Sequence, residues 1–289
     1  MKFKEIIKVI SSPSKKIWQA NVLRKLLFGY VIFNALQTLP VINLLYNPQQ
    51  SLILTSSLKY FTLTTCVNLL SVEGFQNYYA LFFLLQVTAA ILGLFNFFPR
   101  IMTMLVFFLT LNLQNRIYST ITGGDALLCL MLFYLSFVSD GKQAKNNYWK
   151  VIQNVADNTF VFLCQAQLVI LYAVSAIYKW QYSEWVDGTA LQYILSIDEY
   201  STPFIQSIAP NYSLALKFVT WFSLLYQTIF PIAIFIKRIK IPILILGISF
   251  HIMIAIVMGL FNFSLVMICC YVLFFERNQK AMSPMQTKP

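Results

Sequence analysis

Long apolar runs alternate with short polar or basic connections along most of this chain. A helix needs about 20 apolar residues to cross the hydrocarbon core of a bilayer, and eight runs reach or approach that length. They are Leu26 to Tyr46, Tyr79 to Phe98, Ile101 to Leu113, Ala126 to Val138, Phe160 to Lys179, Leu214 to Ile236, Ile241 to Met258 and Leu260 to Phe275. The pattern predicts an all-α, polytopic transmembrane helical bundle of about eight spans, with no large soluble domain.

The same pattern divides the chain into three parts. Residues 1–20 form a basic N-terminal segment, residues 21–276 the membrane domain, and residues 277–289 a short tail. Between the first two spans, Ser51 to Asn77 is only partly apolar, which favours an interfacial or re-entrant helical segment.

Composition and charge agree with a membrane protein. The 289 residues are 58% hydrophobic and 11% charged, which is too apolar for a water-soluble domain. A formal charge of +11 could suggest nucleic acid, but the basic residues occur in short clusters between apolar runs. We therefore expect membrane lipid, and no nucleic acid, as a partner.

The basic residues also predict an orientation. With the N-terminus inside, 17 of the 21 lysines and arginines fall in cytoplasmic segments, and an even number of spans returns the C-terminus to the same side. We expect a multi-pass protein of the plasma (inner) membrane with both termini cytoplasmic. The outer connections then carry most of the acidic residues, so the candidate site is sought there.

Lys179, at the outer end of the fifth run, is the strongest candidate for chemistry. A lysine near the membrane edge can simply extend its amine between aromatic rings to the headgroups. Alternatively, partial desolvation favours the neutral amine, which can accept a proton. Trp185 and Asp187 follow in an outer loop, where a solvated acidic turn is the simplest interpretation.

His251 is the single histidine of the sequence and lies midway along the seventh run. It could be a structural residue with both ring nitrogens satisfied. It could also bind a polar group of a lipid-soluble ligand or relay a proton.

Asn115 and Arg116 precede Gly123, Gly124 and Asp125 between the third and fourth runs. An outer arginine opposes the topological charge bias, so we expect an acidic partner, and Asp125 is the nearest in sequence. Two glycines and an aspartate also suit a turn and a helix N-cap, which would explain Asp125 without a catalytic role.

The predicted topology places these candidates together in the outer half of the bilayer, which favours one site. Lys179 and His251 are the catalytic candidates, and Asn115, Arg116, Asp125, Trp185 and Asp187 the substrate-binding candidates. A zinc-binding His-Glu-x-x-His helix, a phosphate-binding glycine loop and a Gly-x-Ser-x-Gly elbow are absent from the sequence. These omissions argue against metalloprotease and nucleotide-driven functions, and we expect no metal site.

Three stretches resemble the horizontally transferred transmembrane (HTTM) domain family, which includes the membrane part of vitamin K-dependent γ-glutamyl carboxylase. They are Asn115-Arg116 to Gly123-Gly124-Asp125-Ala126-Leu127-Leu128, Ala176-Ile177-Tyr178-Lys179 to Glu184-Trp185-Val186-Asp187-Gly188, and Phe250-His251 to Gly259-Leu260-Phe261-Asn262-Phe263-Ser264. Their order and spacing fit, and the resemblance covers roughly Asn21 to Phe275.

The resemblance implies that Lys179 deprotonates a reduced lipid quinone of the menaquinone type, which then serves in modifying a glutamyl side chain. The resemblance also suggests a role in the maturation of secreted peptide toxins, with a secreted peptide or an accessory protein as partner. Two departures are expected to matter: no histidine stands near Gly123, where the carboxylase has an active-site one, and the substrate-binding lumenal part has no counterpart.

Two main hypotheses follow. In the first, the protein is a membrane enzyme or maturation factor that acts at the outer face, with Lys179 as base and Arg116, Asp125 and His251 orienting a peptide or lipid-soluble substrate. In the second, it is a non-catalytic membrane partner or scaffold of a peptide toxin or a larger complex. A transporter is a third possibility, which the lack of repeats and of buried acidic residues disfavours.

Overall fold

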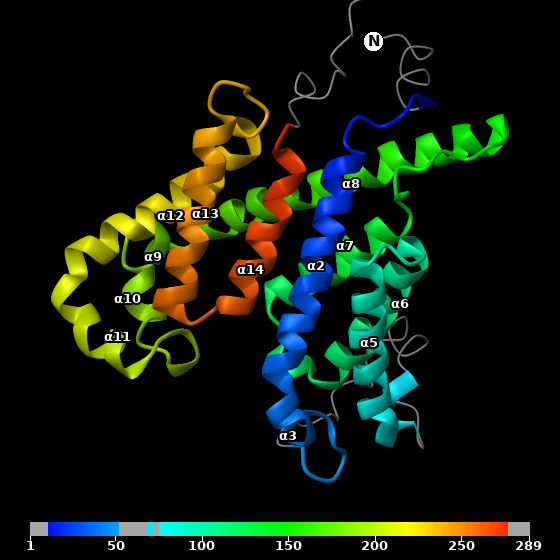
Figure 1. Cartoon of the computed structure of the whole chain (residues 1–289). Coiled ribbons are helices and arrows are strands. Elements are labelled where there is room, and N and C mark those ends of the chain that lie inside the picture. The colour runs from blue at the N-terminus through cyan, green and yellow to red at the C-terminus, as the bar shows by residue number, and fades with distance from the viewer. Residues whose placement is uncertain (1–10, 52–68, 72–74, 277–289) are drawn as a thin grey trace, which may run out of the picture.

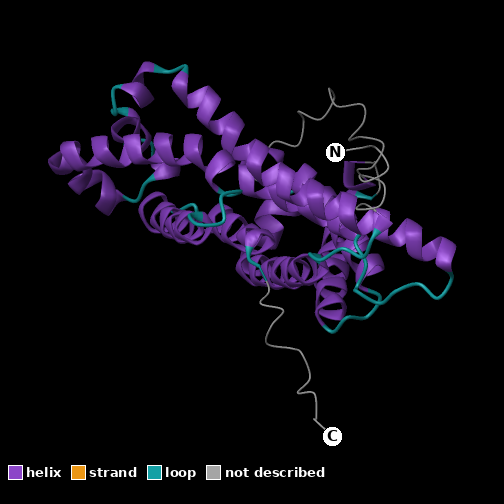
Figure 2. Cartoon of the chain, turned by 90° about the horizontal axis from the view of Figure 1, so that it is seen from above, coloured by secondary structure: helices purple, strands orange, loops and turns teal. Residues whose placement is uncertain are grey.

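A computed structural model describes residues 11–51, 69–71 and 75–276. Within these ranges the chain is helical, with loops and turns between the helices and no strand (Figure 2). The all-α prediction is therefore confirmed for the described part. Most of the predicted re-entrant segment, Ser51 to Asn77, and the tail 277–289 lie outside the described residues.

One group of helices lies to the right in Figure 1, and neighbouring helices in it pack against each other in the order α2, α5, α6, α7. Their bounds are α2 Ile17–Thr38, α3 Ile42–Tyr46, α5 Tyr79–Leu94, α6 Pro99–Arg116 and α7 Gly123–Ser136. A short helical turn, Leu69–Ser71, packs against α6.

The second group lies to the left in Figure 1 and is built around α12. It contains α9 Ser183–Val186, α10 Ala190–Ile194, α11 Pro203–Ile208, α12 Ser213–Ala233 and α13 Lys240–Met258. Two further helices join the groups: α8 (Asn147–Trp180) packs on both α7 and α12, and α14 (Phe261–Cys270) packs on α13, α7 and α2.

Four helical segments are long and apolar enough to cross a membrane, which indicates a membrane protein. They are Ile17–Tyr46, Gln76–Leu94, Asn147–Trp180 and Lys240–Met258, and Gly123–Ser136 and Phe261–Phe274 are shorter apolar helices. All eight predicted runs are largely helical, but a count of eight spans stays a prediction.

Local sequence explains where several helices begin and end. Pro99 starts α6, where its missing N–H needs no partner. The Asn146 side chain accepts from the backbone N–H of Tyr148 at 2.8 Å and caps α8. Gly259 ends α13 with φ of 68°, a left-handed conformation that glycine adopts without strain.

The two ends of the described chain meet at the same end of the bundle. Gln19 Nε2 donates to the Phe275 carbonyl at 2.9 Å, and Lys240 Nζ lies 2.6 Å from Glu276 Oε1. Arg24 is buried there and donates to the Leu135 and Val138 carbonyls at the end of α7, at 2.8 and 2.5 Å. An even number of crossings would produce this arrangement, and the side of the membrane stays a prediction.

Candidate functional site

Lys179 lies in the last turn of α8, and its amine contacts two groups from other helices. Nζ is 3.7 Å from the centre of the Trp185 ring, a cation–π contact, and donates to Ser223 Oγ at 3.2 Å. The ion pairs found in the described part of the chain join Arg100 to Asp157, Lys142 to Asp140 and Lys240 to Glu276. Lys179 thus has aromatic and hydroxyl contacts there, but no carboxylate.

A sharp turn holds Trp185 over this amine. Gly188 has φ of 82°, and a Cβ at this position would lie 2.5 Å from Lys217 Cγ. The Trp221 Nε1 donates to the Val186 carbonyl at 2.8 Å, which fixes the turn onto α12. Only glycine permits both this backbone conformation and this close approach, so the block from Trp185 to Gly188 has a structural role. Asp187 is exposed in the turn.

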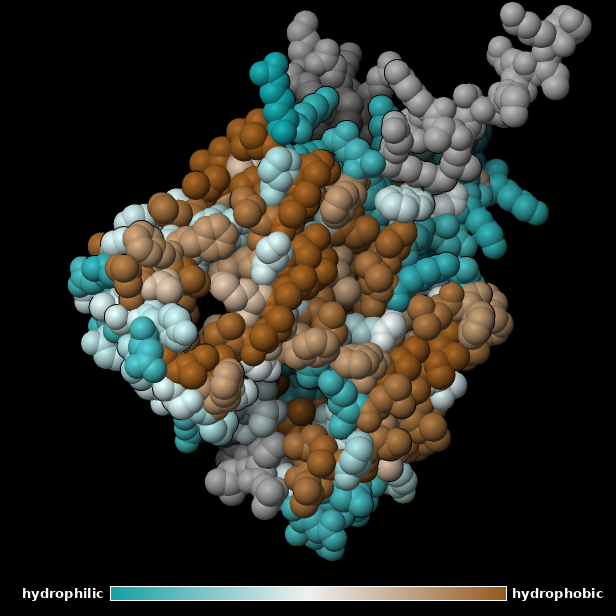
Figure 3. Space-filling view, turned by 60° about the vertical axis from the view of Figure 1, so that its left-hand side comes forward, coloured by the Kyte–Doolittle hydropathy of each residue, from teal (hydrophilic) through white to brown (hydrophobic). Residues whose placement is uncertain are grey.

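Lys179 and Trp185 line an apolar cavity of about 310 Å³. The other walls are α10 residues Leu191 and Ile194, the following Leu195, α12 residues Leu216, Val219, Ser223 and Gln227, α13 residues Phe250, Met253, Ile254, Val257 and Met258, and Leu260. The left-hand face of the molecule is hollowed, and mainly apolar side chains surround the hollow (Figure 3). Such a cavity suits a lipid-soluble molecule.

Gln227 also lines this cavity and has an unsatisfied polar atom that is buried in the protein. The residue is only 9% exposed, and its Oε1 has no hydrogen-bond partner among the described residues. A buried amide oxygen without a partner costs about 1–3 kcal/mol. Ser223 and Gln227 are four residues apart on α12, so both face the cavity from adjacent turns.

Arg116 and Asp125 occupy the other group of helices and have partners of their own. Arg116 is 5% exposed, and its Nε donates to the Tyr46 carbonyl at 3.0 Å and its Nη1 to the Leu70 carbonyl at 3.4 Å. Asp125 Oδ2 accepts from the Thr122 backbone N–H at 2.8 Å and from Thr122 Oγ1 at 2.7 Å. The expected Arg116–Asp125 pair is therefore replaced by carbonyl contacts for Arg116 and a helix cap for Asp125.

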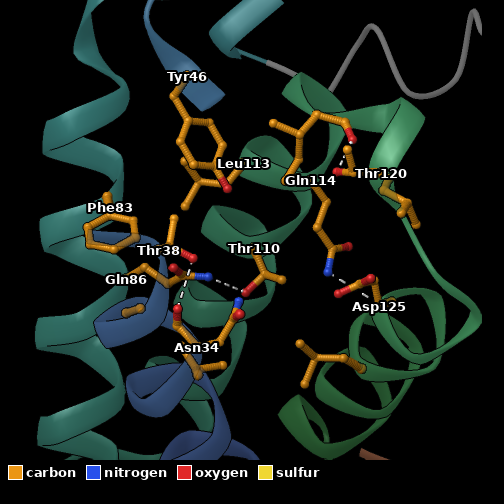
Figure 4. Close-up of a pocket in the computed structure, with 15 residues that line it drawn as sticks. Asn34, Thr38, Tyr46, Phe83, Gln86, Thr110, Leu113, Gln114, Thr120 and Asp125 are labelled. Atoms are coloured by element: carbon orange, nitrogen blue, oxygen red, sulfur yellow. Dashed lines mark hydrogen bonds between the residues drawn. The ribbon is translucent and has the colours of Figure 1, made fainter. Parts of the chain in front are cut away.

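Polar side chains near Asp125 line a cavity of about 60 Å³ between α2, α5, α6 and α7 (Figure 4). Gln86 Nε2 donates to Thr110 Oγ1 at 2.7 Å across it, and Gln114 Nε2 reaches the Asp125 carbonyl at 3.4 Å. The space is about that of one or two water molecules. Asn115 follows Gln114 in the sequence and is buried. Its Nδ2 has no hydrogen-bond partner within the described part of the chain.

His251 belongs to a chain of buried hydroxyl groups in the bundle interior. Its Nε2 lies 2.7 Å from the Tyr172 hydroxyl, which also contacts the Tyr271 hydroxyl, and Tyr271 lies 3.2 Å from the Tyr226 hydroxyl. Gly247 makes room for this network, since a Cβ there would lie 2.1 Å from the Tyr226 hydroxyl. His251 is absent from the residues that line the Lys179 cavity, whereas its neighbour Phe250 is among them.

The structure thus brings Lys179 and Trp185 together and places Arg116, Asn115 and Asp125 in the other helix group. Reasoning from sequence missed Ser223, Gln227 and the tyrosines around His251. Ser223 and Gln227 could have been found, because they are two polar residues with helical spacing inside an apolar run. The described residues contain no group of three His, Cys, Asp or Glu side chains that could hold a metal ion.

Two proteins of Bacillus subtilis (strain 168) are similar to this chain. It is 26% identical to the sporulation-delaying protein SdpB over 194 residues, which cover 63% of this chain and 59% of SdpB. It is 27% identical to the uncharacterized protein YitO over 216 residues, which cover 70% of this chain and 69% of YitO. The match therefore spans less than two thirds of SdpB. No family model and no solved structure matches.

Proposed function

We propose that this protein is a membrane enzyme or maturation factor whose Lys179 accepts a proton from a lipid-soluble or peptide substrate in the apolar cavity. One observation carries the proposal: an amine lines this cavity without a carboxylate partner in the described part of the chain. A lysine placed in apolar surroundings is held there at a free-energy cost, and function is a common reason for it.

The contacts of Lys179 suit a proton acceptor. Trp185 and Ser223 hold the amine in one position and can stabilise its charged form after the proton arrives. The apolar walls exclude water from the substrate and the amine, which strengthens their interaction. This arrangement supports the role of general base.

The resemblance to the HTTM domain family supports a role in maturing a secreted peptide, and the chain is also similar to the sporulation-delaying protein SdpB. A reduced lipid quinone would fit the residues present, because the cavity walls are apolar and Lys179 would hold a polar group of the quinone. Such a group would supply an acidic hydroxyl and reducing equivalents. We place the protein in the plasma membrane with both termini cytoplasmic and the cavity in the outer half.

Lys217 supplies a matched control for the test. Its amine lies 5.0 Å from the centre of the Trp221 ring, so it resembles Lys179 in type and setting, but it does not line the cavity. Secreted peptides from a host strain that lacks this protein are compared by mass spectrometry with those from strains that express wild type, Lys179→Met or Lys217→Met. We expect wild type and Lys217→Met to restore a peptide mass change and Lys179→Met to fail.

Equal protein levels in the membrane fraction make this comparison valid. If Lys179→Met restores the peptide fully at the wild-type protein level, the amine is not the proton acceptor and the proposal is wrong.

A non-catalytic membrane partner is the second candidate, and the contacts of Arg116 and Asp125 favour it. Arg116 binds a backbone carbonyl and Asp125 caps a helix, both in the other helix group. Neither side chain therefore orients a substrate beside Lys179, as the enzyme hypothesis expected. A stoichiometric co-purifying protein, with activity that is unchanged by Lys179→Met and Gln227→Leu, would support this candidate.

A further inference from the structure

The first turns of α8 direct their polar side chains toward the protein. Asn154 and Asp157 are both buried there. Asn154 Nδ2 donates to the Ser11 carbonyl at 2.9 Å, and Asp157 Oδ1 accepts from the Ser139 backbone N–H at 2.6 Å. The chain itself therefore supplies the hydrogen-bond partners of this polar face.

The opposite face of the same turns is apolar and exposed. Tyr148, Val151, Ile152 and Val155 follow the i, i+3, i+4, i+7 spacing that places side chains on one face of a helix, and all four are exposed. Trp149 borders this face and is 60% exposed. These turns form the upper right end of the molecule in Figure 1. A contiguous apolar face of this kind is a contact surface for something other than water.

This face continues without a break along the apolar part of α8. Phe162 and Ile177 are exposed farther along the helix, and the helical period of 3.6 residues puts them in line with Tyr148. The line from Tyr148 to Ile177 is about 44 Å long at a rise of 1.5 Å per residue, whereas the hydrocarbon core of a bilayer is about 30 Å thick.

An upright α8 would therefore leave the first turns in water. Figure 1 shows instead that α8 runs across α2 and not parallel to it, and the two helices are in contact. An inclined helix keeps more of its length at membrane depth. The lipid that covers Phe162 and Ile177 then also covers the apolar face of the first turns.

Basic side chains flank the exposed face. Lys145 precedes α8 and Lys150 lies in its first turn. Neither forms an ion pair in the described part of the chain, and the acidic residues nearest to them in sequence, Asp140 and Asp157, pair with other basic residues. Cationic groups beside an apolar and aromatic face match a lipid surface that carries negative charge.

We infer that the first turns of α8 lie in the bilayer interface and bind anionic phospholipid, on the side where the two ends of the described chain meet. The apolar face lies among the upper acyl chains, Trp149 lies at the level of the head groups, and Lys145 and Lys150 contact lipid phosphates. This inference goes beyond the proposed function. Because α8 carries Lys179 at its other end, the interfacial contact also fixes the depth of that amine.

The fluorescence of Trp149 tests where this face lies. The full chain is reconstituted in phosphatidylcholine and phosphatidylglycerol nanodiscs with a tryptophan-free scaffold protein, and the Trp149 signal is the difference between wild type and Trp149→Phe. Lipids with bromine high on the acyl chain quench tryptophan at the interface, and acrylamide quenches tryptophan in water. We expect strong quenching by this lipid, less by lipid brominated near the chain end, and little by acrylamide.

The same signal measures selectivity for the head group. Brominated phosphatidylglycerol is compared with brominated phosphatidylcholine at equal fractions in otherwise identical nanodiscs. We expect the phosphatidylglycerol to quench Trp149 about twofold more strongly, because the lysines enrich it around the helix. The double variant Lys145→Gln with Lys150→Gln should remove this difference.

A second double variant, Lys237→Gln with Arg238→Gln, is the matched control. These residues are basic and exposed, but they belong to the connection between α12 and α13. The preference for phosphatidylglycerol should therefore stay at its wild-type value.

Strong quenching of Trp149 by acrylamide, with none by brominated lipid, would overturn the inference. Equal quenching by the two brominated head groups in wild type would overturn its anionic part. Tyr148→Trp provides a second reporter on the same face, and its added emission should show the same pattern. The test therefore does not depend on the folding of Trp149→Phe.

Discussion

The Lys179 cavity and the Arg116–Asp125 region both place polar side chains in a largely apolar bundle, but they differ in how those groups are satisfied. Arg116 binds two backbone carbonyls, and Asp125 binds Thr122. Within the described residues, Lys179 lines the cavity without a carboxylate partner, and the buried Gln227 Oε1 lacks a donor. A polar group that the chain itself satisfies supports the fold, whereas a lysine amine that lines a cavity without a carboxylate partner is available to a ligand.

The largest expected effect tests whether Arg116 is structural. Arg116→Ala leaves the Tyr46 and Leu70 carbonyls without their donor in a buried setting, so we expect a loss of about 3 kcal/mol of stability. Thermal unfolding of the purified protein in detergent measures it. Lys179→Met is the comparison, and we expect no loss there because its amine has one hydroxyl contact and a ring contact. Comparable losses in both variants would remove the contrast between the regions.

A smaller effect is expected at the contact between α7 and α14. A Cβ at Gly124 would lie 2.7 Å from the Phe263 Cα, so Gly124→Ala must push the two backbones apart and should destabilise by about 1–3 kcal/mol. Gly123→Ala is the matched control, because its Cβ meets only Phe263 Cε2, at an ordinary 3.7 Å. The same melting assay separates them, and equal stability of the two variants would show that α14 does not approach α7 this closely.

The smallest effect concerns Asp125. Asp125→Ala removes the acceptor for Thr122 and should lower stability by about 1 kcal/mol, as loss of a helix cap does. Asp125→Asn keeps an oxygen acceptor and should lose less. Peptide processing should follow the amount of folded protein in both variants. If Asp125→Asn abolishes processing at the wild-type protein level, the carboxylate has a chemical role and the two regions function together.

Much of the fold could be predicted because it depends on local pattern. The apolar runs predicted helices, and the described chain is helical in all of them. The start of α7 was also partly readable, since glycines and an acid at the beginning of an apolar run indicate a helix cap. The N-cap residue itself, Thr122, was not identified from the sequence. Asp125 lies in the first turn of α7 and completes the cap by accepting from the Thr122 backbone N–H.

The grouping of the candidate residues could not be predicted in the same way. Topology placed Arg116, Asp125 and Lys179 at similar depth, but depth does not say which helices are neighbours. Arg24 illustrates the same limit, because it counts as a cytoplasmic basic residue by the charge rule, yet its guanidinium is buried against the end of α7.

The sequence by itself determined that this is a helical membrane protein and that a lysine ends one apolar run near aromatic residues. These features follow from the length and periodicity of apolar segments and from the energy of placing charge in lipid. Only the tertiary structure decided which polar groups are satisfied, because partners such as Ser223 for Lys179, or Tyr46 for Arg116, come from segments distant in sequence. Helix packing brings these segments together, and it also leaves Gln227 facing a cavity.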